Sequence, residues 1–217
     1  MDKPKIRLCV PCPNHGGVSR QTLASIEEFR GHPDWDADVC LCRGTTIATQ
    51  RCAGVNFDES SRISQNMDYS REFDYYLAVD GDIVFTPGNV RQLLAHNLDI
   101  VGGAYLSRPI PEGFTAGNFF DDTRVVSHGK FLHKSSTGLQ EVDWIGMGFT
   151  LIKRGVFRRM FYPWWRERVE TMTVDGIAYA ANSGDDVGFC IGAREAGYKI
   201  YCDCDCAVEH LTEYKGG

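Results

Sequence analysis

The chain has 217 residues, of which 43% are hydrophobic and 24% are charged, a balance typical of a globular protein with a substantial core. No linker or repeat divides it, so we expect a single domain over residues 1–217. Lys and Arg total 23 against 29 Asp and Glu, and this net charge of −6 argues against a broad nucleic-acid or anionic-membrane surface. No apolar run is long enough to span a bilayer and residues 1–7 carry no signal-peptide core, so we expect a cytosolic protein.

Strand-like and helix-like segments alternate along the chain. Apolar or alternating runs predict strands over residues 6–10, 38–42, 75–79, 100–105, 142–152 and 198–202. Apolar residues at helical spacing predict helices that begin at Ser19 or Thr22, within 47–71, at Pro87, at Arg154 and at Ser183. Residues 107–141 are rich in loop signals, with room for a hairpin around Gly129. The alternation predicts an α/β fold with a mostly parallel mixed sheet flanked by helices.

The most informative motif follows the third predicted strand. The apolar run Tyr75–Val79 ends abruptly in Asp80-Gly81-Asp82. Ligands of open α/β sheets bind at the carboxyl ends of the strands. In Asp-x-Asp the alternate side chains project to the same side, so Asp80 and Asp82 could share one Mg²⁺ or Mn²⁺. The triplet alone fits equally well a strand end that merely begins a turn, because Asp and Gly are common turn residues.

A second acidic motif, Asp185-Asp186, opens the predicted helix that begins at Ser183. A carboxylate at a helix start can act as a cap and interact favourably with the helix dipole. That explanation accounts for one aspartate and gives no reason for two. A carboxylate in reach of a substrate hydroxyl could instead accept its proton.

The chain contains nine cysteines, and an odd number cannot all form pairs. Cys202, Cys204 and Cys206 alternate along the chain beside the last predicted strand, which would place their thiols on one face. Free cysteine behaves as a small buried hydrophobe, and the spacing differs from that usual for zinc ligands. We therefore expect reduced, buried thiols rather than a zinc site.

Four segments, taken in order, carry a family resemblance. They are residues 76–84, 99–105, 142–149 and 183–190. Together they resemble the nucleotide-sugar glycosyltransferases of the GT-A fold, in particular compact family-two-like forms of bacteria and large viruses or phages. The resemblance covers nearly the whole chain and implies a GT-A-like, Rossmann-like domain. It also implies a bacterial cytosol, or a host cytosol for a viral chain.

The resemblance implies roles for the acidic residues and for one histidine. Asp82 would bind Mn²⁺ or Mg²⁺ directly, Asp80 would contact the ribose or the metal, and His210 would supply a further metal ligand. Asp186 would be the general base of an inverting transfer, with Asp185 positioning the substrates. Most versions of this motif have Glu before Asp, so the reach of Asp185 departs from the pattern.

The resemblance also implies contacts to the donor and the acceptor. Pro11 and Asn14 would lie beside the nucleotide. An arginine before the metal-binding strand would contact the donor, and both Arg51 and Arg62 are candidates: Arg62 has the better spacing and Arg51 the better local pattern. The resemblance also implies that the glycine-containing segment Gly146, Met147 and Gly148 would lie beside the sugar and the acceptor.

Three tryptophans could build an acceptor wall, because aromatic faces stack on sugars and bases. Core packing is the stronger interpretation for Trp144, which lies in a predicted strand. Trp164 and Trp165 are flanked by charged residues, which equally favours a partly exposed lid or contact surface.

The predicted activity is the transfer of a sugar from a nucleoside diphosphate sugar to an acceptor hydroxyl. The acceptor could be a glycan, a protein, a lipid-linked sugar or a modified nucleobase in DNA. A nucleotidyltransferase is the rival enzyme class, but residues 11–17 carry no Lys or Arg for a phosphate loop. A binding module without catalysis is the rival outside enzymes.

Overall fold

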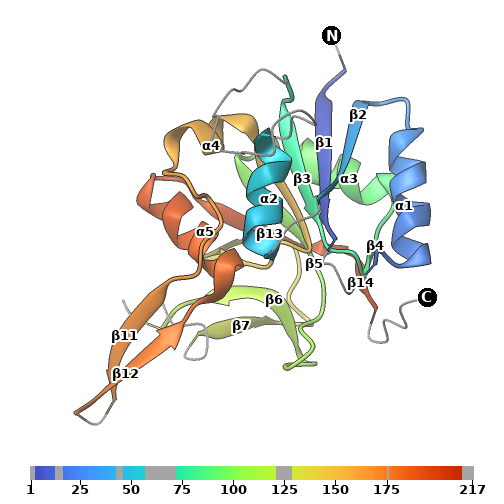
Figure 1. Cartoon of the computed structure of the whole chain (residues 1–217). Coiled ribbons are helices and arrows are strands. Elements are labelled where there is room, and N and C mark those ends of the chain that lie inside the picture. Colours follow the sequence, from blue (N-terminus) through green and yellow to red (C-terminus); the bar gives the residue numbers. More distant parts are fainter. Residues whose placement is uncertain are drawn as a thin grey trace.

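The computed structural model describes residues 3–12, 17–42, 46–56, 72–120, 129–174 and 176–211 (Figure 1). Its centre is a seven-stranded sheet formed by β1 (Lys5–Pro11), β2 (Asp36–Cys42), β3 (Tyr75–Val79), β5 (Ile100–Ala104), β8 (Leu139–Val142), β10 (Phe149–Lys153) and β13 (Ile200–Ala207). The strand order is β2-β1-β3-β10-β5-β13-β8. Strands β8 and β10 run antiparallel to their neighbours and the other pairings are parallel. The predicted mostly parallel mixed sheet is confirmed.

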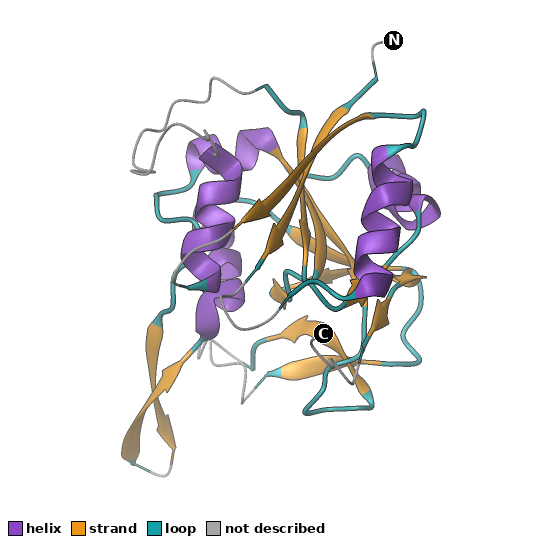
Figure 2. Cartoon of the chain, turned by 45° about the vertical axis from the view of Figure 1, so that its right-hand side comes forward, coloured by secondary structure: helices purple, strands orange, loops and turns teal. Residues whose placement is uncertain are grey.

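Helices cover both faces of this sheet, as Figures 1 and 2 show. They are α1 (Arg20–Arg30), α2 (Ile47–Asn56), α3 (Pro87–Ala95), α4 (Arg154–Arg159) and α5 (Gly184–Glu195). Local sequence explains two of the starts: the Ser19 side chain caps α1 by accepting from the Thr22 N–H, and Thr86 with Asn89 forms a capping box ahead of α3. The predicted helix from Arg154 ends at Arg159, short of Tyr162.

The core is divided between the two faces of the sheet. Leu8 and Leu77 pack with side chains of α1 and α3, whereas Cys9 and Ala78 pack with side chains of α2, α4 and α5. Successive residues of β1 and β3 thus point to opposite faces, and both faces are covered. This explains why these strands read as continuous apolar runs.

Three smaller sheets are built from the remaining strands. The first has the order β7-β6-β9, with β6 (Gly113–Asn118), β7 (Lys130–His133) and β9 (Trp144–Ile145), and it lies beyond the carboxyl ends of the parallel strands (Figure 2). The second pairs β4 (Ile83–Val84) with β14 (Glu209–His210), and the third is the ribbon of β11 (Val169–Val174) and β12 (Ile177–Asn182). The ribbon extends away from the main sheet (Figure 1).

Several predicted element bounds need correction. Residues 142–152 do not form one strand: the segment divides into the end of β8, then β9, then β10. Between the last two, the Gly146 N–H bonds to the Thr115 carbonyl while its own carbonyl accepts from the Thr150 hydroxyl, so the chain turns from the small sheet into the main one. The loop-rich segment 107–141 contains β6, β7 and the start of β8. The antiparallel pairing of β6 with β7, which sets Asn118 opposite Lys130, agrees with the hairpin predicted around Gly129. The β11–β12 ribbon was not predicted.

Trp164 and Trp165 pack in the core, so the predicted exposed lid is wrong. Each is 1% exposed. The Trp165 ring stacks on Phe189 of α5 with a centroid distance of 4.8 Å, and the Trp164 indole N–H donates to the Phe157 carbonyl at 2.9 Å. Of the charged neighbours, Glu167 is exposed and Arg166 and Arg168 are half-buried, which is why the local composition resembled that of a surface segment.

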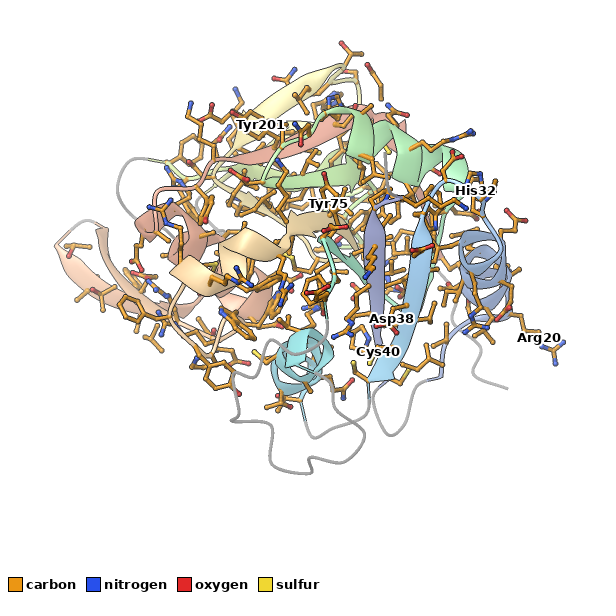
Figure 3. All side chains as sticks on the ribbon, turned by 90° about the horizontal axis from the view of Figure 1, so that it is seen from above. Arg20, His32, Asp38, Cys40, Tyr75 and Tyr201 are labelled. Carbon is orange, nitrogen blue, oxygen red and sulfur yellow. The ribbon has the colours of Figure 1, made fainter. Side chains whose placement is uncertain are left out.

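All nine cysteines are free, and all except the half-buried Cys12 are buried. Cys202, Cys204 and Cys206 all lie in β13, which is longer than the predicted strand. The prediction of a single face is wrong for Cys206: the register shifts between Asp203 and Ala207, and Cys206 packs on the α1 and α3 side while Cys202 and Cys204 pack on the opposite side. A second group joins β1 and β2: the Cys42 sulfur lies 3.1 Å from that of Cys9 and 3.0 Å from that of Cys40. Figure 3 shows Cys40 on β2, beside α2. The predicted burial is confirmed for eight thiols.

No helix in the part of the chain that the structure describes is long and apolar enough to cross a bilayer.

Candidate functional site

A cleft of about 630 Å³ lies at the carboxyl ends of β1, β3 and β5. The β6-β7-β9 sheet forms its far wall through Thr115, Phe131 and Trp144. Seven predicted site residues line it: Pro11, Asp80, Asp82, Trp144, Gly146, Asp186 and His210. Segments far apart in the sequence therefore meet at the edge of the sheet where α/β proteins bind ligands.

The β4–β14 pairing brings His210 to Asp82. His210 pairs with Ile83, and the Leu211 N–H donates to the Asp82 carbonyl at 2.9 Å. The His210 Nδ1 lies 3.0 Å from the Leu106 carbonyl, which places Nε2 3.6 Å from the Asp82 carboxylate. A ring whose Nδ1–H donates to a carbonyl presents an Nε2 lone pair. A carboxylate oxygen of Asp82 and the Nε2 nitrogen of His210, two possible metal ligands, thus face the same part of the cleft.

Charged neighbours shift the pKa values of this pair in opposite directions. The Asp82 carboxylate beside the ring raises the pKa of His210, although burial of the ring opposes the shift. Burial of Asp82 would raise the pKa of its carboxyl group, but His210 and Arg108 together lower it. Asp82 is therefore held as a carboxylate at neutral pH.

Arg51, on α2, joins three acidic residues. Its Nη2 donates to Asp80 at 2.8 Å, and its Nη1 donates to Asp185 at 2.8 Å and also to Asp186. The Arg51 side chain is only 3% exposed, and Tyr76 fixes its backbone by donating to its carbonyl at 3.2 Å. Burial alone would lower the pKa of Arg51, but the three carboxylates raise it well above its ordinary value. Arg51 is thus a fixed positive charge beneath the cleft.

Asp186 occupies the first turn of α5, where its side chain is 29% exposed and faces the cleft. One carboxylate oxygen accepts from the Met147 N–H at 3.0 Å, and the other accepts from Arg51. Burial raises the pKa of Asp186 to about 6, against the opposing effect of Arg51. Each carboxylate oxygen has a second lone pair, so Asp186 can still accept a proton from a group in the cleft.

The glycines beside Met147 make room for the ring of Tyr105. The Gly148 N–H donates to the Tyr105 hydroxyl at 2.9 Å, and a Cβ at Gly148 would lie 2.7 Å from that oxygen. A Cβ at Gly146 would clash with the same hydroxyl and with Thr115. Gly148 also accepts from the Asp80 N–H at 3.0 Å. The glycine-containing segment therefore fixes the backbone of Asp80 through the Gly148 carbonyl and the carboxylate of Asp186 through the Met147 N–H.

An aromatic wall closes the other side of the cleft. Trp144 is 3% exposed, and its ring meets Phe131 edge-on with a centroid distance of 4.8 Å. Trp144 packs in the core and also lines the cleft, so its position agrees with both core packing and a place in an acceptor wall. Its indole N–H has no hydrogen-bond partner in the part of the chain that the structure describes.

The fit of a divalent cation can be judged from the donors present. No group of three or more His, Cys, Asp or Glu side chains within the described ranges is suited to a metal ion. The carboxylates of Asp80 and Asp82 turn to different arginines, Arg51 and Arg108. Asp82 and His210 remain as an adjacent oxygen and nitrogen pair beside an open cleft, and this donor set suits Mn²⁺ with further positions free.

The sequence left some site residues undecided or unnoticed. The structure places Arg51 against the predicted carboxylates, whereas Arg62 and Asn14 lie outside the described residues. Tyr105 and Arg108 were not predicted, although both line the cleft. Tyr105 directly follows the apolar strand β5, which offered a signal, but Arg108 is a single loop arginine with no pattern around it.

Comparisons with known proteins establish the fold alone. No protein-family model matches the sequence, and no curated protein matches it either. Among solved structures, the crystal structure of A197 from STIV matches with a TM-score of 0.59 and 19% sequence identity. The match covers 96% of this chain and 87% of that one. The chain therefore shares with A197 an α/β fold in which helices flank a mixed sheet.

Proposed function

We propose that this protein is a metal-dependent glycosyltransferase that moves a sugar from a nucleoside diphosphate sugar to an acceptor hydroxyl, with inversion. One observation carries the proposal: a single cleft at the carboxyl edge of the sheet contains Asp82 with His210 and, apart from them, Asp186. The first pair suits a cation and the diphosphate it accompanies, and Asp186 suits proton removal. The family resemblance and the fold shared with A197 agree with this assignment.

The donor end would be held by Asp82 and His210, with Asp80 nearby. A bound divalent cation would act as a Lewis acid and stabilise the negative charge that develops on the leaving diphosphate. Asp82 and His210 would hold that cation, and Arg51 would keep Asp80 oriented. Pro11, at the end of β1, would lie against the nucleotide.

The acceptor hydroxyl would lose its proton to Asp186. The raised pKa of about 6 makes this carboxylate a better proton acceptor than an ordinary aspartate, and it is still ionised at neutral pH. Arg51 and the Met147 N–H would keep the carboxylate in place while leaving lone pairs for the acceptor. Trp144 and Phe131 would offer the acceptor an apolar face, as aromatic rings do for sugars and nucleobases.

A panel of nucleoside diphosphate sugars would test the proposal. Each is added with Mn²⁺ and scored by the shift in unfolding temperature and by release of nucleoside diphosphate, because bound ligand stabilises the folded state. We expect at least one donor to bind and turn over only when Mn²⁺ is present, and Asp82→Asn to weaken that dependence. Stabilisation without turnover across acceptors would favour a binding module, and no stabilisation by any donor would contradict the proposal.

A further inference from the structure

Arg108 is the exposed counterpart of Arg51 at the cleft. It follows β5 in the loop before β6, and its Nη2 donates to the Asp82 carboxylate and to the Leu211 carbonyl, the latter at 3.1 Å. Its side chain is 50% exposed, whereas that of Arg51 is 3% exposed. Arg51 is therefore held in place by its surroundings, and Arg108 is free to take other positions.

Arg108 and a divalent cation would compete for the same atom. The guanidinium contacts Oδ2 of Asp82, which is also the oxygen nearest to the His210 ring. A cation held by Asp82 and His210 would sit beside the guanidinium, and like charges repel. Cation binding thus requires Arg108 to leave Asp82. This movement leaves no buried polar group without a partner, because water can replace the exposed contact to the Leu211 carbonyl.

The position that Arg108 would take next follows from its chemistry. It lines the cleft, as do Ser107 and Pro109 on either side of it. The diphosphate of a nucleotide sugar carries two negative charges and gains a third when the sugar leaves, and that third charge exceeds what one divalent ion neutralises. A guanidinium binds phosphate oxygens through paired N–H donors, so an Arg108 displaced by the cation would find its new partner in the diphosphate that accompanies that cation.

We propose that Arg108 exchanges partners during donor binding: it neutralises Asp82 before the metal ion binds and contacts the diphosphate afterwards. This inference rests on the proposed function, because it assumes that a metal ion and a diphosphate share the cleft. It assigns Arg108 a binding and positioning role that complements the fixed charge of Arg51.

Two probes that need no knowledge of the sugar or base would test the exchange. Isothermal titration calorimetry measures the affinity for Mn²⁺ alone and then the affinity for inorganic pyrophosphate at saturating Mn²⁺. In Arg108→Ala we expect tighter Mn²⁺ binding, because the competing cation is gone. We expect pyrophosphate affinity to fall by about ten- to a hundredfold, the usual loss of a charged hydrogen bond. Arg108→Lys should keep the competition with Mn²⁺ but lose part of the pyrophosphate affinity.

Arg30→Ala is the matched control, since Arg30 is 53% exposed and pairs with one carboxylate, Glu27, away from the cleft. It should leave both affinities unchanged. Unaltered Mn²⁺ affinity in Arg108→Ala would refute the competition, and unaltered pyrophosphate affinity would refute the second contact. The exchange is also refuted if the unmodified protein binds no pyrophosphate with Mn²⁺. If Arg108→Ala shows tighter Mn²⁺ binding and weaker pyrophosphate binding but the unmodified protein transfers no sugar, the exchange is supported and the glycosyltransferase proposal is contradicted.

Discussion

At the scale of single residues, one buried guanidinium organises the acidic side of the cleft. Arg51 contacts carboxylates from the end of β3 and from the start of α5, which are separated by more than a hundred residues. Without it, Asp80, Asp185 and Asp186 would repel one another in a partly buried space. The second aspartate of the Asp185-Asp186 motif, which a helix cap does not explain, therefore has a structural partner as well as a place beside the cleft.

Replacing Arg51 should destabilise the fold. Arg51→Met keeps an unbranched, apolar side chain but leaves three carboxylates without their shared cation, and breaking a buried ion pair costs about 3–5 kcal/mol. Arg51→Lys keeps the charge but loses the planar guanidinium, so its free energy of unfolding should fall by less than that of Arg51→Met. Urea denaturation measures both. An unfolding midpoint for Arg51→Met equal to that of the unmodified protein would show that the carboxylates do not depend on this residue.

Replacing Asp186 should separate binding from transfer. Asp186→Asn keeps the size of the side chain and can still accept from Arg51, but it no longer accepts a proton. Transfer should fall by about a hundred- to ten-thousandfold, the usual contribution of general-base assistance. Mn²⁺-dependent donor affinity should change little. If transfer persists at a near-normal rate, Asp186 is not the base, and Asp185 becomes the residue to test.

The pH dependence of transfer should follow the ionisation of Asp186. Its carboxyl faces Arg51, which lowers the pKa, and Asp185 and Asp80, which together with burial raise it to about 6. A base acts in its deprotonated form, so the rate should climb as pH rises through about 6 and level off above it. Transfer rates measured at saturating donor, from pH values below this pKa to values above it, would show the rise. A rate that is flat from well below this value would contradict the assignment.

At the scale of elements, the reversed strand β10 brings backbone groups to the edge of the sheet that borders the cleft. Phe149 pairs with Val79 and Thr150 with Gly102, so β10 begins where β3 and β5 end. The residues just before β10 therefore reach Asp80 and Asp186 through Gly148 and Met147. The short strand β14 acts in a similar way, because its pairing with β4 fixes His210 beside Asp82.

The β14 strand can be tested by shortening the chain. A protein that ends at Val208 lacks Glu209 and His210, whereas one that ends at Leu211 keeps both and serves as its control. We expect the shorter protein to bind Mn²⁺ more weakly than the control, with similar unfolding temperatures, since Val208 retains its bond to the Ala104 carbonyl. Equal Mn²⁺ affinities by calorimetry would remove His210 from the metal site.

The predictable elements are those whose signals are local. Ser19 and Thr86 cap their helices, and apolar runs mark β1 and β3, so sequence alone located these elements. The division of residues 142–152 was not predictable, because the turn depends on bonds to Thr115 and Tyr105, distant in sequence. The contacts of Arg51 were likewise not predictable, because only tertiary structure brings Asp80 and Asp185 to the same guanidinium.

At the scale of the whole molecule, cysteines take the place of larger apolar residues in the core. Cys9, Cys42 and Cys52 lie in the layer between the sheet and α2. Gly54 leaves space there for the Cys9 sulfur, because a Cβ on Gly54 would overlap it. Burial raises the pKa of Cys206 and that of Cys190 to about 12, so these thiols are protonated and poorly reactive.

The thiols should be reduced and protected in the native protein. An aromatic disulfide reagent should modify Cys12, which is half-buried, before any of the eight buried cysteines. After denaturation it should titrate all nine. Elemental analysis should find no stoichiometric zinc. A native count well above one thiol, or bound zinc, would show that the cysteines serve a purpose other than packing.

The stretch of chain between β5 and β10 begins and ends at two neighbouring strands of the main sheet. The two ends of this excursion are therefore anchored side by side, whatever lies between them. Closing a longer loop costs only about 0.6 kcal/mol for each doubling of its length. Its one contribution to the main sheet, β8, is an edge strand. Evolution could thus lengthen or trim the outer part of this excursion, around β6 and β7, while Met147 and Gly148 at its end still hold Asp186 and Asp80.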